Sequence, residues 1–147
     1  MADTHWTPLL VEERMVEAAE VLSRLPETRL RGYFGTWPPV VREFRESFGW
    51  HETQLRRPRP SPAAIDRMDE AFTWLPWLDP IDARIVWLRA SGEPWKVICW
   101  KVGMARTAAH QHWMFGLCVI AWRLNGRRLP RNLSRRRVIE QTQASQS

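Results

Sequence analysis

Residues 94–124 contain a short apolar segment, a three-residue turn and a long amphipathic segment, in that order. The turn is Gly103-Met104-Ala105, and glycine can adopt the positive φ that a sharp change of direction needs. We expect Met104 to fill the angle between two helices and Arg106 to begin the longer one. This spacing is typical of a helix-turn-helix unit, and it constrains the fold more than any other feature of the chain.

Proline and glycine divide the rest of the chain into further short helices. Apolar residues recur at three- and four-residue intervals, and no segment alternates with a period of two, so we predict an all-α fold of about six helices. The expected helix starts are Thr7-Pro8, Pro38-Pro39, Ser61-Pro62 and Asp79-Pro80. In the last of these helices, we expect Ile81, Ile85 and Leu88 to face inward and Asp82 to interact with the helix dipole.

Composition suggests four regions along the chain. We expect a helical interaction lobe over residues 1–50 and an extended, exposed linker over 51–60, where Arg56–Pro60 is rich in arginine and proline. The helix-turn-helix domain is expected over 61–126. The tail, 127–147, is first basic and then has a disordered composition.

The positive charge is concentrated in the second half of the chain. The net charge is +6 and the sequence pI is about 10.6. Residues 1–78 carry 10 basic and 12 acidic side chains, a net charge of −2, whereas residues 79–147 carry 12 basic and 4 acidic ones, a net charge of +8. A basic surface of this kind favours a polyanionic partner, first a nucleic acid and second an anionic membrane surface.

Side chains suited to DNA gather on and around the longer helix. Arginine pairs with guanine, glutamine with adenine, and an apolar methyl group contacts thymine, and helix-turn-helix motifs read bases with the first turns of the second helix. Lysines on the short helix and arginines after the long one suit phosphate contacts. The candidate base-reading residues are Arg106, Thr107, Ala108, His110 and Gln111. The candidate phosphate contacts are Lys96, Lys101, Arg123, Arg127, Arg128 and Arg131.

Two stretches, Ala83–Arg89 and Trp95–Ala109, resemble region 4 of bacterial sigma factors. Ala105 stands where that family usually has a capping serine or threonine. The chain is also similar to small phage-derived regulators of alphaproteobacteria, including activators of gene transfer agents. The resemblance implies a transcription regulator, most simply an activator, that binds double-stranded DNA. It also implies contact with RNA polymerase or another regulator through the N-terminal lobe.

Two other functions fit the same pattern. A small terminase-type subunit of a phage-like packaging machine also pairs a helix-turn-helix with an oligomerising helical region. A structural or adaptor protein can contain a helix-turn-helix corner with no role on DNA. A ring of about eight or more subunits would favour packaging, and a monomer or dimer would favour regulation.

Enzymatic, metal-binding and membrane functions are not expected. The chain has no glycine-rich phosphate loop, G-x-S-x-G or H-E-x-x-H motif, so we predict neither catalytic residues nor a cofactor. The spacing of Cys99, His110, His112 and Cys118 matches no common zinc pattern. No signal peptide or membrane-spanning run is visible, so we expect a cytoplasmic location. The ten tryptophans are expected to fill the core.

Overall fold

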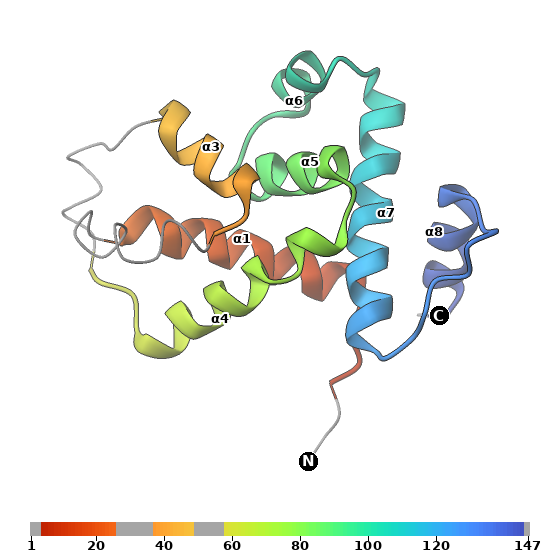
Figure 1. The fold of residues 1–147 in the computed structure, drawn as a ribbon, viewed down its shortest axis with the longest axis horizontal. Coiled ribbons are helices and arrows are strands. Elements are labelled where there is room, and N and C mark those ends of the chain that lie inside the picture. Colours follow the sequence, from red (N-terminus) through yellow and green to blue (C-terminus); the bar gives the residue numbers. More distant parts are fainter. Residues whose placement is uncertain (1–3, 26–36, 49–57, 146–147) are drawn as a thin grey trace.

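The structure, a computed structural model, describes residues 4–25, 37–48 and 58–145, except for the side chains of 44–48. These residues form helices joined by turns and contain no strand, which confirms the all-α prediction. None of the described helices is both long enough and apolar enough to cross a lipid bilayer. The elements in Figure 1 are α1 (Pro8–Arg24), α3 (Pro39–Phe48), α4 (Pro62–Phe72), the short 3₁₀ helix η3 (Leu75–Trp77), α5 (Pro80–Ala90), α6 (Trp95–Val102), α7 (Arg106–Leu124) and α8 (Arg135–Ala144).

Side-chain caps fix the starts of α1 and α4. Thr7 Oγ1 accepts a hydrogen bond from the backbone N–H of Leu10 at 3.2 Å, and Ser61 Oγ accepts one from Ala64 at 3.1 Å. Each cap is followed by a proline, whose missing N–H has no helical partner to lose at this position. Both starts agree with the sequence prediction.

A single apolar core joins α1 to the C-terminal helices. The buried stripe of α1 and buried residues of α4, α5 and α7 belong to one continuous cluster. The segment before α1 also meets the C-terminal end of α7, because Trp6 and Asn125 exchange two hydrogen bonds of 2.9 Å each. This corrects the expectation of a helical interaction lobe over residues 1–50, because α1 belongs to the shared core. The apolar face of α1 is covered by α4, α5 and α7, not by a partner (Figure 1).

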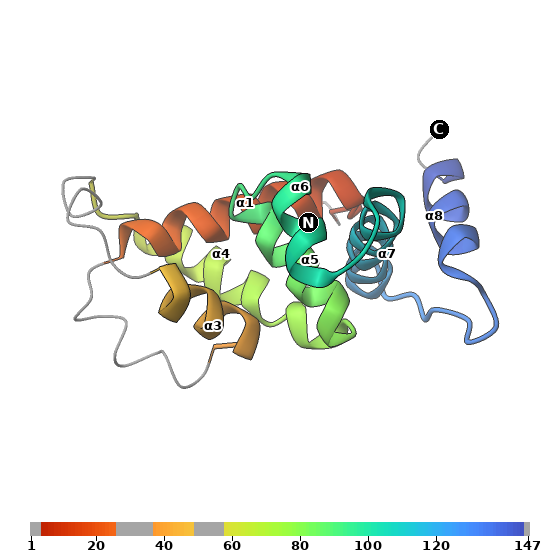
Figure 2. The same cartoon turned by 90° about the horizontal axis from the view of Figure 1, so that it is seen from above.

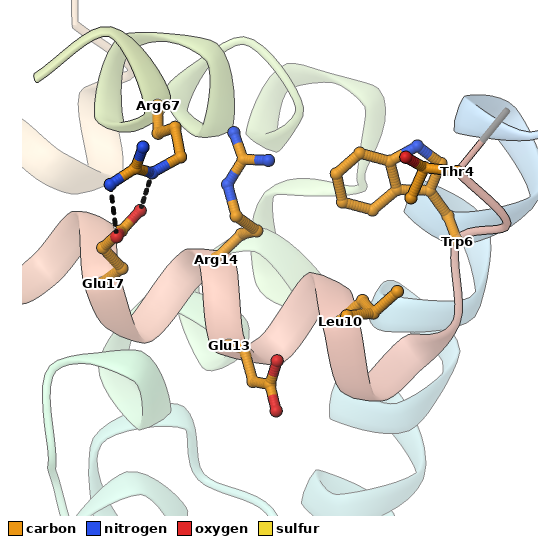
Figure 3. Close-up of a pocket in the computed structure, with 7 residues that line it drawn as sticks. All are labelled: Thr4, Trp6, Leu10, Glu13, Arg14, Glu17 and Arg67. Carbon is orange, nitrogen blue, oxygen red and sulfur yellow. Dashed lines mark hydrogen bonds and ion pairs between the residues drawn. The ribbon is translucent and has the colours of Figure 1, made fainter. Parts of the chain in front are cut away.

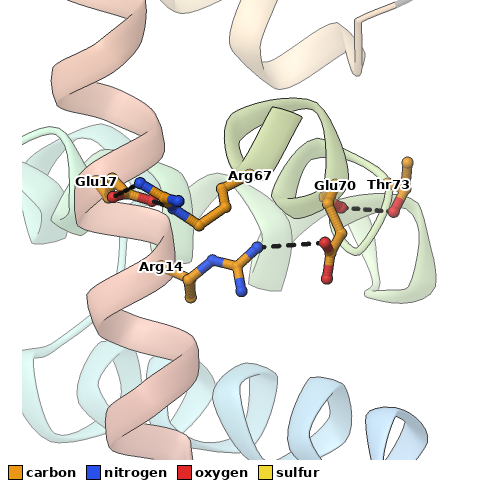
Figure 4. A network of polar contacts seen from close by, with 5 residues as sticks. All are labelled: Arg14, Glu17, Arg67, Glu70 and Thr73. Atoms are coloured by element: carbon orange, nitrogen blue, oxygen red, sulfur yellow. Dashed lines mark hydrogen bonds and ion pairs between the residues drawn. The ribbon is translucent and has the colours of Figure 1, made fainter. Parts of the chain in front are cut away.

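Polar contacts reinforce the packing of α1 on α4. The Arg67 guanidinium donates two hydrogen bonds to the Glu17 carboxylate, at 2.8 and 3.0 Å. One turn further along, Arg14 lies 3.4 Å from a Glu70 oxygen (Figure 4). Together the two pairs fix how the two helices lie against each other.

Of the predicted linker, residues 51–57 lie outside the described residues. Arg59 is exposed, as expected, but Pro60 is buried. The start of α4 is therefore held against the rest of the protein.

The tail also differs from its sequence prediction. Residues 135–144 form α8, whose first turn is capped by Ser134. Val138 and Thr142 bury one side of α8 against α7, and the indole N–H of Trp122 donates to Thr142 Oγ1 at 2.7 Å. Figure 2 shows α8 beyond α7 at one end of the molecule. The tail is rich in Arg, Gln and Ser, which suggested disorder, because composition alone does not reveal that two of its residues are buried.

Candidate nucleic-acid interface

A left-handed glycine joins α6 to α7. Gly103 has φ 68° and ψ 36°, and its N–H and that of Met104 both donate to the carbonyl oxygen of Cys99, at 2.9 and 3.2 Å. This closes α6 and turns the chain toward Ala105, which precedes α7 without a side-chain cap. The turn predicted at residues 103–105 is therefore formed as expected.

One face of α6 is buried against α5. Ile98 is fully buried in a small cluster with Ile85 and Leu88 of α5, and Met104 packs at its edge, as predicted. Ala109 of α7 is fully buried as well. The three helices α5, α6 and α7 thus form a packed unit, and the opposite face of α7 is left outward.

The first two turns of α7 present an exposed and mainly polar face. All five candidate base-reading residues are exposed, on either side of the buried Ala109. No acidic residue occurs anywhere in 106–124. The face offers a guanidinium, a hydroxyl, an imidazole, an amide and a methyl group. Its residues are Arg106, Thr107, Ala108, His110 and Gln111.

The two lysines of α6 differ in their surroundings. Lys96 is exposed. Lys101 is half-buried, and its ammonium lies 3.8 Å from the carboxylate of Glu93, which is also mostly covered. A phosphate would have to compete with this carboxylate, so Lys96 is the better placed of the two for an anion.

An aromatic cluster, absent from the sequence prediction, supports His110. The centroid of the His110 ring lies 5.2 Å from the centroid of the Trp113 ring and 5.4 Å from that of the Trp95 ring. The guanidinium of Arg89 lies 5.1 Å from the centroid of the Trp95 ring. The imidazole is therefore held by packing while remaining exposed. The sequence signal was the spacing of three between His110 and Trp113 on one helix.

A buried polar contact between α5 and α7 is the second feature that the sequence analysis missed. His112 Nδ1 lies 2.6 Å from Asp82 Oδ1, and Asp82 is only 1% exposed. Burial raises the pKa of the Asp82 carboxyl, and the hydrogen bond and charge of His112 act in the opposite direction. Ile85 and Leu88 face inward as predicted, but the prediction for Ile81 is wrong, because Ile81 is 50% exposed and the neighbouring Asp82 is buried instead.

Gly116 allows α7 to lie close to α5 one turn beyond His112. A Cβ added to Gly116 would lie 2.9 Å from Val86 Cγ2 and 3.3 Å from Leu78 Cδ1. The first distance is shorter than real side chains tolerate, so glycine is required for this approach.

Arg123 and the arginines that follow it are exposed, and Arg123 lies far from the candidate base-reading face. Arg123 is at the opposite end of α7 from Arg106, about 25 Å away at a rise of roughly 1.5 Å per residue. Its guanidinium lies 4.5 Å from the Trp77 ring, and that of Arg127 lies 5.7 Å from the Trp122 ring. The predicted phosphate contacts therefore fall into two groups. The group at and beyond the C-terminal end of α7 is Arg123, Arg127, Arg128 and Arg131.

A hollow of about 350 Å³ beside α1 lies outside this unit. It is lined by charged residues of both signs (Figure 3). The Arg14 guanidinium at its wall lies over the rings of Trp6 and Trp74, at 5.5 and 5.3 Å. The cations here already face carboxylates of the protein, as the Arg67–Glu17 pair illustrates. The hollow therefore has less positive character than the exposed face of α7.

Neither cysteine belongs to a cluster of ligating residues. Cys118 is buried, and burial raises its pKa to about 11. Cys99 is half-buried on α6. Within 4–25, 37–48 and 58–145, no three side chains of His, Cys, Asp or Glu lie close enough together to hold a metal ion.

Comparison with known proteins finds one match. No curated protein and no solved structure matches the chain. A family described as a domain of unknown function, DUF6362, matches residues 23–120. The matched region ends within α7 and includes α5, α6, the turn and the base-reading candidates, whereas α8 lies beyond it. Because the match covers most of the sequence, the chain belongs to the DUF6362 family.

Proposed function

We propose that this protein is a sequence-specific regulator of transcription that binds double-stranded DNA with the α6–turn–α7 unit. The observation that carries the proposal is the exposed face at the start of α7, which is polar, free of acidic residues and backed by buried Ala109. A helix with one face packed on its scaffold and the other exposed at its N-terminal turns fits the width of the major groove.

Each side chain of this face has a chemical role in the proposal. Arg106 can donate two hydrogen bonds to guanine, and Gln111 can both donate to and accept from adenine. The methyl group of Ala108 suits the thymine methyl. His110, held by its aromatic neighbours, adds a donor or an acceptor. Lys96 lies on the preceding helix, where phosphate contacts orient such units on the duplex.

A regulator that activates transcription also needs a protein partner, which we propose to be RNA polymerase or another regulator. Leu9 and Val16 are exposed apolar residues seven positions apart on α1, and exposed Glu13 lies between them. These side chains are available for a protein contact that leaves the start of α7 to the DNA.

Selection of genomic fragments bound in cells tests the proposal. Enrichment of a few promoters is expected, because base contacts favour particular sequences over the rest of the genome. Enrichment of a single packaging locus would support the terminase-type alternative. Uniform coverage, or no recovered DNA, would contradict sequence-specific regulation.

A further inference from the structure

The contact between Asp82 and His112 lies directly behind the proposed base-reading face. His112 follows Gln111 in sequence and lies one helical turn after Ala108, but it points toward α5. Its partner Asp82 is buried near the start of α5. We call these two residues the α5–α7 pair.

The surroundings of the pair are apolar. Ile85 and Val86 of α5 and Leu117 of α7 are all buried, and Gly116 lets the two backbones approach closely. Apolar packing is not directional, so it allows small rotations and shifts of one helix on the other. A hydrogen bond of 2.6 Å between fixed atoms restricts these motions, and buried polar groups of this kind can fix the register between elements.

The Asp82 carboxylate depends strongly on His112. Its second oxygen, Oδ2, is buried and has no hydrogen-bond partner within the described protein. The other charges that act on the carboxyl are those of Arg135 of α8 and Asp79 at the start of α5. Among the described residues, α1, α3 and α6 contribute none. Moving α7 away from α5 would leave the carboxylate without its single hydrogen bond, so the pair resists that movement.

We propose that the α5–α7 pair positions the base-reading turns of α7, so that breaking it lowers discrimination between DNA sequences even where the fold is preserved. The inference rests on the proposed function. Base contacts need donor and acceptor atoms within a few tenths of an ångström of the base edges, whereas phosphate contacts tolerate small rotations. A shifted α7 therefore loses specific affinity and keeps non-specific affinity.

The decisive variant replaces both partners with leucine, Asp82→Leu with His112→Leu. Exchanging a buried charged pair for apolar residues of similar size is often neutral or stabilising, so a cooperatively unfolding protein is expected. Two matched controls keep a hydrogen bond available: Asp82→Asn, whose amide oxygen can accept from the imidazole, and His112→Asn, whose amide nitrogen takes the place of Nδ1 and can donate to the carboxylate.

The measurement is fluorescence anisotropy with the selected DNA site and a scrambled duplex of the same composition. The quantity of interest is the Kd for the scrambled duplex divided by the Kd for the selected site. We expect the double leucine variant to reduce this ratio at least about tenfold, as for the removal of one base contact, with binding to the scrambled duplex unchanged. Both controls should stay within about threefold of the wild-type ratio. A double leucine variant that unfolds cooperatively and keeps the wild-type ratio would overturn the inference.

The remaining outcomes can also be told apart. If the double leucine variant does not fold, His112→Ala decides, because it removes the imidazole and leaves Asp82 without its hydrogen bond. Its ratio should fall by a similar factor, and an unchanged ratio would again overturn the inference. If the wild type itself does not distinguish the two duplexes, the proposed function fails and the inference fails with it. If the wild type discriminates but none of the variants changes, only the inference fails.

Discussion

The two ends of α7 differ in charge and in support. The N-terminal end, 106–111, carries a single arginine among small and polar side chains, and α5, α6 and an aromatic cluster hold it from behind. The C-terminal end, from Arg123 into α8, carries seven arginines between 123 and 137 and no acidic residue. Under the proposed function the two ends have separate roles, because base reading needs fixed geometry and phosphate contact needs mainly charge. We therefore propose that the first end selects a sequence and the second strengthens binding to any sequence.

The largest effect on this contrast is expected from removing the base-reading side chains. Replacing Arg106 and Gln111 with alanine should cost about 1–3 kcal/mol of specific binding free energy for each base contact that is removed. Binding to a scrambled duplex should change little by comparison. Anisotropy titrations with both duplexes measure the two effects, and Arg84→Ala, an exposed arginine on α5, is the matched control. Equal losses on both duplexes would contradict a base-reading role.

A substitution that disturbs the close approach of α7 to α5 should have an effect nearly as large. Gly116→Ala places a methyl group 2.9 Å from Val86, so we expect destabilisation of about 1–3 kcal/mol from overpacking. Gly92→Ala is the control, since its Cβ meets nothing within 4 Å and only the strain of φ 91° remains. Urea unfolding of both variants compares the two costs. A smaller loss at Gly116 than at Gly92 would show that the helices separate easily.

The charged end should give a smaller and non-selective effect. Replacing Arg127, Arg128 and Arg131 with glutamine should weaken binding to the selected and the scrambled duplex by the same factor. For each phosphate that is no longer neutralised, the slope of log K against log salt should also become shallower by about 0.9. Titrations at several salt concentrations provide both quantities. A change in the ratio of the two affinities would mean that this end also reads sequence.

Loss of one hydrogen bond between α7 and α8 should lower the stability of the protein moderately. Thr142→Val keeps the volume but removes the acceptor for the Trp122 indole, so about 1 kcal/mol of stability should be lost. Tryptophan fluorescence during urea unfolding provides the measurement. The exposed Gln143→Val is the control, and an equal effect of the two substitutions would argue against the bond.

The smallest effect is expected away from α7, at the Arg67–Glu17 pair. The hydrogen bond from Arg67 lowers the pKa of Glu17 below its ordinary value of 4.5. The folded state therefore holds this carboxylate ionised more strongly than the unfolded state does. The added stability is present above pH 4.5 and is lost as the pH falls through the lowered value. Thermal unfolding of wild type and Glu17→Gln should differ at pH 7 and converge in acid, and a difference that is constant with pH would refute the pair.

Local signals predicted much of the fold, and long-range packing explains the rest. Thr7, Ser61 and Gly103 were informative because capping and positive φ depend on neighbouring residues alone. The placement of α1 in a shared core could not be read from its own stripe, since any apolar surface satisfies that pattern. Likewise, α8 is held by only two buried residues, which composition does not reveal.

The candidate site likewise has some features that the sequence predicted and others that it could not. The exposure of the base-reading residues followed from the helical period and the burial of Ala109. The contact of Asp82 with His112 could not be predicted, because it joins residues 30 positions apart and places a carboxylate where an apolar side chain was expected. The separation of Arg123 from Arg106 was hidden by their common charge, and it follows only from the length of α7.

Methylation interference at guanine N7 tests the central claim most directly, because N7 lies in the major groove and is an acceptor for arginine. The selected duplex is methylated sparsely, bound by the protein, separated from free DNA and cleaved at the modified guanines. The account predicts that methylation at one or two guanines blocks binding by the wild type, and that Arg106→Ala removes this interference at a specific position. Binding that is insensitive to N7 methylation, or interference that Arg106→Ala leaves unchanged, would contradict the reading of DNA by the start of α7.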